Sequence, residues 1–298
     1  MKLLLLDAGN SRLKWALLRK PYRRGQEFSG QGVVELSALR SKGAWSRLLK
    51  KAKNPDLIYA CNVAGPGIER QLRAASRRAG IGAPHFAHSE VAAAGVRNGY
   101  PDPWRLGVDR WVGLIGAHHE HPGKDICLVG LGTAMTIDLL SADGRHFGGC
   151  IVPGPRLMIE SLLKHTAGIR RRAGGRNATQ RFDLMFGVVS RSGGRWVYLE
   201  RPGSAGKSAG TGLFARDTHA GLLVGARRAC AALIEYAVRE GREHLGHRPW
   251  LILAGGAAAA ITPLLHGRYW REDDLVLRGL AVLAAGTEAP DRIKSTRA

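Results

Sequence analysis

The sequence is short of paired cysteines and has no long hydrophobic run. Its four cysteines lie far apart and form no CxxC pair, which excludes a zinc-ribbon protein and a small disulfide scaffold. The apolar stretch near the N-terminus is interrupted at Asp7 after only a few residues. That stretch is too short for the core of a signal peptide or for a membrane span, and no later segment qualifies. We therefore expect a cytoplasmic protein with no membrane segment.

Acidic residues are also scarce. The chain has 24 Asp and Glu against 45 Lys and Arg, for a formal net charge of +21. Such an excess fits either a generally basic surface or a polyanionic partner such as nucleic acid, acidic lipid or a nucleotide. The sequence lacks zinc-finger spacing and an aromatic-rich basic module, so a dedicated nucleic-acid domain is disfavoured and a generally basic surface is the preferred interpretation.

What the sequence does have is a repeated pattern. An apolar strand, a glycine turn and a second strand occur in "KLLLLDAGNSRLKWALL" and again in "DICLVGLGTAMTIDLL". Each copy is followed by alternating strands and helices, which is typical of the α/β class. With 298 residues the chain is long enough for two domains. We predict a duplicated α/β fold with domains at 1–112 and 113–298.

One stretch departs from this pattern. Residues 170–216 are rich in glycine and basic residues around a short apolar segment, "RWVYLE", that could form a small hairpin. Loops of this length are usually functional or disordered. We interpret the stretch as a solvated insertion in the second domain, with a lid or a polyanion-binding arm as the alternative.

The turn after the first strand contains residues suited to phosphate chemistry. Gly9 allows a phosphate to approach the backbone, Asn10 and Ser11 supply donors, and Asp7 could hold magnesium directly or through water. Taken alone, this turn fits an ordinary hairpin better than a site. A second donor-rich turn at Gly132 and Thr133 occupies the matching place in the other half, which makes a pair of phosphate loops more plausible.

Two further segments are candidates. Gly255 and Gly256 follow the strand "WLILA" and suit close approach by a nucleoside. Asp109 and Arg110 follow Gly107 at the start of a predicted helix. A carboxylate there could accept a hydroxyl proton during phosphoryl transfer, and the guanidinium could hold an anionic substrate. The competing explanation for Asp109 is a favourable interaction with the helix dipole.

Together these stretches resemble the type III pantothenate kinases, including the branch named Bvg accessory factor. The resemblance covers nearly the whole chain. It runs in the family's order through "DAGNSRLKW", "YPDPWRLGVDRW", "GTAMTID", "GGCIVPGPRLMIESL", "DTHAGLLVGA", "LILAGG" and "LVLRGLA". Each motif is modest alone, whereas the ordered set is highly specific.

The resemblance implies two ribonuclease-H-like domains of the acetate-and-sugar-kinase/Hsp70/actin superfamily. It also implies ATP-dependent phosphorylation of pantothenate to 4'-phosphopantothenate, the first step of coenzyme A biosynthesis. Magnesium and a monovalent cation, potassium or ammonium, are the implied ions, and a homodimer is the implied assembly.

The resemblance also implies roles for individual residues. Asp109 would be the catalytic base and Asp7 the acidic residue of the first phosphate motif. The implied ATP- and phosphate-binding residues are Asp7, Gly9, Asn10, Ser11, Lys14, Gly132, Thr133, Gly255 and Gly256. The implied pantothenate-binding residues are Tyr100, Gly107, Arg110 and Thr218.

The sequence departs from the family at one notable place. Many members have an aspartate two residues before the glycine of the second phosphate motif, where it is associated with the monovalent cation. This chain has Gly130 there. Two alternatives to an active pantothenate kinase stay open. One, based on the net charge, the basic insertion and Gly130, is a regulatory or accessory protein that binds polyanions or nucleic acid; the other is another kinase of the same superfamily.

Overall fold

The chain forms two compact units in the computed structural model. The structure describes residues 1–19, 21–41, 43–53, 55–174, 188–192, 195–199 and 212–285. The first unit contains residues 1–124, 140–148 and the described chain after 273; the second contains the described parts of 125–139 and 149–273. The domain division expected from the sequence stays a prediction, and its boundary at residue 112 falls inside helix α3 (Val108–Glu120).

The first unit is built on a five-stranded sheet of order β3-β2-β1-β4-β5. Its strands are β1 (Lys2–Ala8), β2 (Arg12–Arg19), β3 (Gly30–Glu35), β4 (Leu57–Asn62) and β5 (His85–Phe86). β2 runs antiparallel to both β1 and β3, whereas β4 runs parallel to both β1 and β5. Gly9, in the tight turn between β1 and β2, donates its N–H to the carbonyl of Arg12 at 3.0 Å. The predicted hairpin is confirmed.

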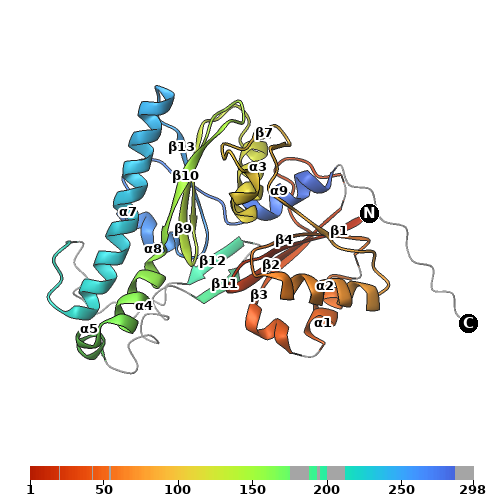
Figure 1. Cartoon of the computed structure of the whole chain (residues 1–298), viewed down its shortest axis with the longest axis horizontal. Helices are drawn as coiled ribbons and strands as arrows, with labels where there is room; N and C mark the ends of the chain where they lie inside the picture. The colour runs from red at the N-terminus through yellow and green to blue at the C-terminus, as the bar shows by residue number, and fades with distance from the viewer. Residues whose placement is uncertain are drawn as a thin grey trace, which may run out of the picture. The chain divides into compact units, whose positions relative to one another are not determined.

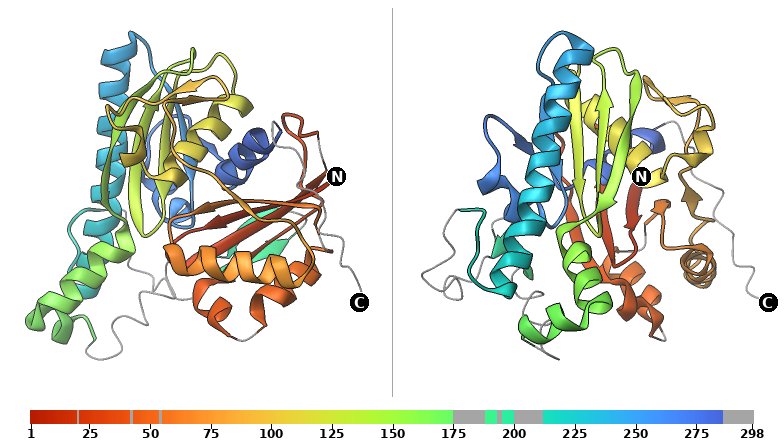
Figure 2. Two further views of the ribbon diagram at one scale, coloured as in Figure 1. Left: turned by 45° about the vertical axis from the view of Figure 1, so that its right-hand side comes forward. Right: turned by 60° about the vertical axis from the view of Figure 1, so that its left-hand side comes forward.

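Helices cover both faces of this sheet, as Figures 1 and 2 show. Leu4 and Leu6 of β1 pack in a cluster with α1 (Ala44–Lys51) and α2 (Pro66–Arg78). Leu3 and Leu5 are also fully buried and, by strand alternation, face the other side. There α9 (Leu275–Ala284) contacts β1 and β4. A run of four leucines thus forms a strand buried on both faces.

Helices α3 and α9 approach each other unusually closely. A Cβ added to Gly116 would lie 2.1 Å from the carbonyl oxygen of Leu275, and one added to Gly279 would lie 1.9 Å from that of Val112. Because neither glycine has a side chain, the two backbones can touch, and no larger residue would fit at either position. Helix α9 is therefore docked on the helix that carries Asp109.

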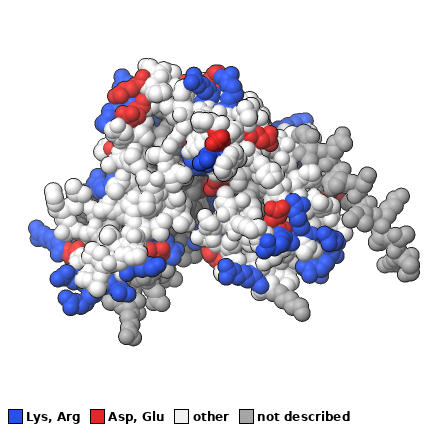
Figure 3. Space-filling model, viewed as in Figure 1, with Lys and Arg blue, Asp and Glu red and all other residues white. Residues whose placement is uncertain are grey.

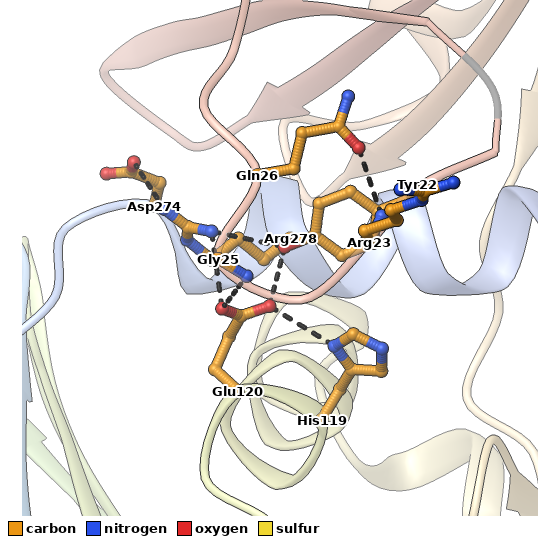
Figure 4. Close-up of polar contacts among 8 residues, drawn as sticks. All are labelled: Tyr22, Arg23, Gly25, Gln26, His119, Glu120, Asp274 and Arg278. Atoms are coloured by element: carbon orange, nitrogen blue, oxygen red, sulfur yellow. Dashed lines mark hydrogen bonds and ion pairs between the residues drawn. The ribbon is translucent and has the colours of Figure 1, made fainter.

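A polar cluster lies next to this close contact (Figure 4). Glu120 of α3 accepts hydrogen bonds from the Tyr22 hydroxyl at 2.5 Å and from the Gly25 N–H at 3.0 Å. Arg278 of α9 donates to Glu120 at 3.3 Å and to Tyr22 at 3.1 Å. Burial of the Glu120 carboxylate raises its pKa, but the hydrogen bond from Tyr22 and the charge of Arg278 outweigh this effect, so the pKa of Glu120 is lowered. The cluster fixes the segment after β2 to both helices.

The second unit has a five-stranded sheet of order β10-β9-β8-β13-β14. Its strands are β8 (Ile126–Leu131), β9 (Ala134–Leu140), β10 (His146–Pro153), β13 (Trp250–Ala254) and β14 (Trp270–Arg271). β13 runs parallel to both β8 and β14. The long α7 (Thr218–Leu245) and the short α8 (Ala258–Ile261) pack on β8, β9 and β13. Helix α4 (Pro155–His165) and the short α5 (Ala167–Arg172) contact α7.

Smaller elements complete both units. These are η1 (Leu36–Arg40), β6 (Ala92–Ala93), β7 (Val96–Arg97), η2 (Pro103–Arg105) and η4 (Thr262–Leu264). The hairpin expected near "RWVYLE" is present as β11 (Val188–Ser192) and β12 (Arg195–Leu199). Much of the remaining 170–216 insertion lies outside the described residues.

The strand order confirms the predicted fold class. Reading from the first strand of each unit, both sheets place a hairpin on one side and two later strands on the other. The chain is therefore a mixed α/β protein with a repeated five-stranded sheet, as the two similar sequence patterns predicted. Within the described residues, no helix is both long and apolar enough to cross a bilayer.

Candidate active site

The end of β1 places Asp7 among the groups that the sequence singled out. Asp7 pairs with Lys14 on β2 and with Cys61 on β4. Its carboxylate is partly buried. Desolvation raises the pKa of Asp7 to about 6, the Lys14 ammonium opposes that rise, and the Asp109 carboxylate adds to it. Asp7, Lys14 and Asp109 therefore share one electrostatic environment within the first unit.

Asp109 lies in the first turn of α3, which begins after Gly107. Its Oδ1 accepts the N–H of Arg110 at 2.9 Å. A Cβ added to Gly107 would lie 2.8 Å from that same oxygen, so glycine gives the carboxylate room to fold back over the helix start. Burial and the carboxylates of Asp7 and Asp109 also raise the pKa of Cys61 well above its ordinary value. Cys61 is therefore a thiol rather than a nucleophile.

Arg110 is a buried cation with an aromatic partner. Only 7% of the residue is exposed, and its Nη1 donates to the Tyr100 hydroxyl at 3.0 Å. The guanidinium carbon lies 5.6 Å from the centre of the Tyr100 ring, within the range of a cation–π interaction. The structure thus joins Tyr100, Gly107, Asp109 and Arg110 in one corner of the first unit.

The carboxylate of Asp7 fits a magnesium ion that is held mainly by phosphate. No group of three or more His, Cys, Asp and Glu side chains that could form a metal site occurs in the described parts of the chain. Magnesium bound with a nucleotide commonly takes one or two protein carboxylates and fills its other positions with phosphate and water. Asp7 supplies one such carboxylate, and its raised pKa marks a place where added positive charge is stabilising.

In the second unit, two glycine turns lie at neighbouring strand ends. Gly132 and Thr133 follow β8, and Gly255 follows β13, which runs parallel to β8. Gly255 has φ +99°, and a Cβ there would lie 2.5 Å from the Leu131 carbonyl oxygen. The carboxyl ends of adjacent parallel strands are the usual ligand-binding edge of an α/β sheet. The structure therefore places the turn at Gly132 and Thr133 next to the turn at Gly255.

Two residues that the sequence analysis did not choose, Asp273 and Gly154, hold these turns in place. The Gly255 N–H donates to Asp273 Oδ1 at 3.1 Å, although the two residues share no local motif. Gly154, at the start of α4, donates its N–H to the Thr133 carbonyl at 2.9 Å. A Cβ on Gly154 would lie 2.3 Å from the Gly132 carbonyl oxygen. Its place between two prolines was the one available signal, since it marked a turn.

The remaining predicted residues lie in three places. Asn10 and Ser11 are in the β1–β2 turn with Gly9. Thr218 is the first residue of α7, where the Asp217 side chain caps the helix by accepting the Ala220 N–H at 2.8 Å. Gly256 shares the turn of Gly255. A role for Thr218 in binding pantothenate stays a prediction.

Gly130 occupies the interior of β8 opposite Ala254 of β13. A Cβ at this position would lie 2.7 Å from the Thr136 Oγ1. The Thr136 hydroxyl therefore covers the place where a carboxylate side chain would begin.

Comparison with known proteins gives a consistent result. The profile of the type III pantothenate kinase family matches residues 3–183. A type III pantothenate kinase of Burkholderia ambifaria is 37% identical over 295 residues, which are 97% of this chain and 98% of that protein. Another, from Nitrosococcus oceani, is 32% identical over 289 residues, 96% of this chain and 94% of that protein.

Solved structures show the same fold at lower identity. A Baf family protein from Campylobacter jejuni has a TM-score of 0.52 at 19% identity, and the match covers 94% of this chain and 96% of that one. A Sinorhizobium meliloti protein described provisionally as a 2-dehydro-3-deoxygalactonokinase has a TM-score of 0.50 at 16% identity, with 95% and 98% covered. These two matches show that the chain shares the fold of those proteins.

Proposed function

Because this chain belongs to the type III pantothenate kinase family, we propose that it transfers the γ-phosphoryl group of ATP to the primary hydroxyl of pantothenate. The reaction yields 4'-phosphopantothenate and ADP and opens coenzyme A biosynthesis. The observation that carries this proposal is the shared environment of Asp7, Lys14 and Asp109, in which Asp109 acts on the pKa of Asp7.

In the proposed mechanism Asp109 is the general base. Its carboxylate accepts the hydroxyl proton as the substrate oxygen bonds to the γ-phosphorus and the bond to the bridging β–γ oxygen breaks. Arg110, held by Tyr100, pairs with the pantothenate carboxylate. The backbone and side-chain donors of the β1–β2 turn bind phosphate oxygens, and Lys14 neutralises part of their charge.

The proposal includes ions and assembly. Asp7 is the residue that would hold magnesium, directly or through water, and the ion would neutralise charge on the phosphates. Gly132, Thr133, Gly255 and Gly256 are the further residues that we propose to bind ATP. A homodimer in the cytoplasm is part of the proposal, whereas a potassium or ammonium site at Gly130 is not.

Turnover of purified protein tests this function. With ATP, magnesium and pantothenate we expect phosphopantothenate, and Asp109→Asn should lower kcat by at least 10²-fold. Glu69→Gln is the matched control, because Glu69 is the acidic residue in the first turn of α2 and shares only the helix-dipole role. Equal turnover in the wild type and Asp109→Asn would contradict the role of Asp109, and no turnover in the wild type would contradict the function.

A basic surface on α1 and α2 favours a second candidate function, polyanion binding. Exposed basic residues gather on these helices and their flanks (Figure 3): Arg40, Arg47, Lys50, Lys51, Lys53, Arg70, Arg77 and Arg78. The acidic residue on α1 and α2, Glu69, is paired with Arg73. A cavity of about 380 Å³ on this surface is lined by Arg40, Arg70 and Arg78 among others.

Salt-dependent binding of a labelled DNA duplex tests the second function. A polyanion site on this surface predicts that Arg70→Ala/Arg78→Ala weakens binding and flattens its salt dependence, since fewer counterions are released. Arg239→Ala/Arg242→Ala on α7 is a control that removes the same charge elsewhere. Deletion of residues 170–216 tests the insertion separately. Binding that is equally weak in the wild type and in all three variants would contradict this function.

A further inference from the structure

His146 is a buried titratable residue that the proposed mechanism leaves unused. It is the first residue of β10 and belongs to the first unit. Only 1% of it is exposed. A buried imidazole is uncommon unless its polar atoms and its ring have defined partners, so its neighbours indicate what it does.

The His146 ring stacks on Tyr100. The ring centres are 5.9 Å apart and the planes are inclined by 11°, which is an offset-stacked geometry. The hydroxyl of Tyr100 accepts the hydrogen bond from Arg110. Tyr100 therefore lies between His146 and the guanidinium that we assign to the substrate carboxylate.

His146 also fixes the backbone next to Tyr100. The Gly99 N–H donates to His146 Nδ1 at 3.4 Å. A Cβ on Gly99 would lie 2.0 Å from the His146 carbonyl oxygen, so the two backbones touch and only glycine fits. From the other side, Asn98 Oδ1 accepts the Tyr100 N–H at 3.0 Å. The loop that presents Tyr100 is thus held on both sides.

We propose that His146 is a positioning residue for pantothenate: it sets Tyr100 through the ring stack and the Gly99 hydrogen bond, and Tyr100 sets Arg110. This inference rests on the proposed function for the identity of the substrate. A side chain held at both ends by packing and hydrogen bonds loses little entropy when the anion binds. His146 acts only through Tyr100, so its effect should be confined to pantothenate.

The test compares three variants. His146→Ala removes the stack and the acceptor, whereas His146→Phe retains an aromatic ring and loses both ring nitrogens, including the Nδ1 acceptor. His85→Ala is the matched control, because His85 lies on β5 and stacks on Tyr59 of β4 with ring centres 6.0 Å apart and an 8° inclination. We expect His146→Ala to raise the KM for pantothenate about tenfold, with the KM for ATP unchanged and kcat within about twofold.

The phenylalanine variant should recover most of the pantothenate KM, and His85→Ala should have the wild-type value. The inference is overturned if His146→Ala has the wild-type KM for pantothenate, if it raises both KM values equally, or if His85→Ala matches it. Hydrogen exchange supplies a readout that does not need turnover: the Gly99 and Tyr100 amides should exchange faster in His146→Ala and His146→Phe than in the wild type. Unchanged exchange would overturn the positioning role, whereas an inactive wild type would overturn only the proposed function.

Discussion

Asp7 and Lys14 are direct partners in the antiparallel pairing of β1 and β2. Burial has the largest effect on the pKa of Asp7 and raises it. The Lys14 ammonium lowers this pKa, and the Asp109 carboxylate raises it further. This one strand pair thus controls how much negative charge the candidate phosphate turn carries near neutral pH.

Replacing Lys14 should shift the pH dependence of the reaction. Without the ammonium, the pKa of Asp7 should rise above 6, so the acid limb of the kcat/KM profile should move to higher pH by roughly half a unit to one unit. Lys14→Met removes the charge, and Lys14→Arg retains it and serves as the control. An acid limb at the same pH in Lys14→Met and in the wild type would contradict the assignment of that limb to Asp7.

Asp7 should cost stability at neutral pH. The folded-state pKa of Asp7, about 6, lies above the ordinary 3.8, so the folded state binds the proton more tightly than the unfolded state does. The contribution of protonated Asp7 to folding stability is therefore lost as pH rises from about 4 to 6. Asp7→Asn should therefore be more stable than the wild type at pH 8, by about 1–3 kcal/mol, while losing kinase activity. Thermal or urea unfolding at pH 8 and below pH 4 measures this, and the difference should vanish at the lower pH. A less stable Asp7→Asn protein at pH 8 would show that the aspartate makes favourable contacts that offset its desolvation.

The parts of the site that the sequence could predict are local. The Asp7 hairpin, the turn at Gly132 and the helix start at Asp109 each occupy a few consecutive residues, where glycine, small polar residues and apolar alternation determine the backbone. Repetition of the first pattern in the second half made the duplicated α/β fold predictable as well.

The contacts that hold the site could not be predicted in this way. Gly99 and His146 are 47 residues apart, and Gly255 and Asp273 are 18 apart, with no local pattern linking either pair. Their pairing depends on how segments from different elements pack, and the sequence states only that glycines and polar residues are present. The raised pKa of Asp7 likewise results from burial by the assembled sheet.

The turn at Gly255 should not tolerate a side chain. Gly255→Ala places a Cβ 2.5 Å from the Leu131 carbonyl oxygen at φ +99°, so the turn must shift away from the end of β8. We expect loss of at least about 2 kcal/mol of unfolding free energy or, if the turn adjusts, a raised KM for ATP with the KM for pantothenate unchanged. Gly225→Ala on α7 is the control, since nothing lies within 4 Å of its added Cβ. That variant should be as stable as the wild type or about 1 kcal/mol more stable.

Gly130 should make the kinase insensitive to potassium. In the related pattern an aspartate at this position is associated with the monovalent cation, and here the Thr136 hydroxyl covers the place where that side chain would start. A glycine supplies no carboxylate to hold a weakly binding cation, so turnover with saturating magnesium and ATP should be the same in potassium, ammonium and sodium buffers of equal ionic strength. Holding ionic strength constant is essential, because a chain with a formal charge of +21 responds to salt by screening alone. Activation by potassium and ammonium but not by sodium would mean that other oxygen ligands hold the ion, and Thr136→Val would then test whether the hydroxyl next to Gly130 is one of them.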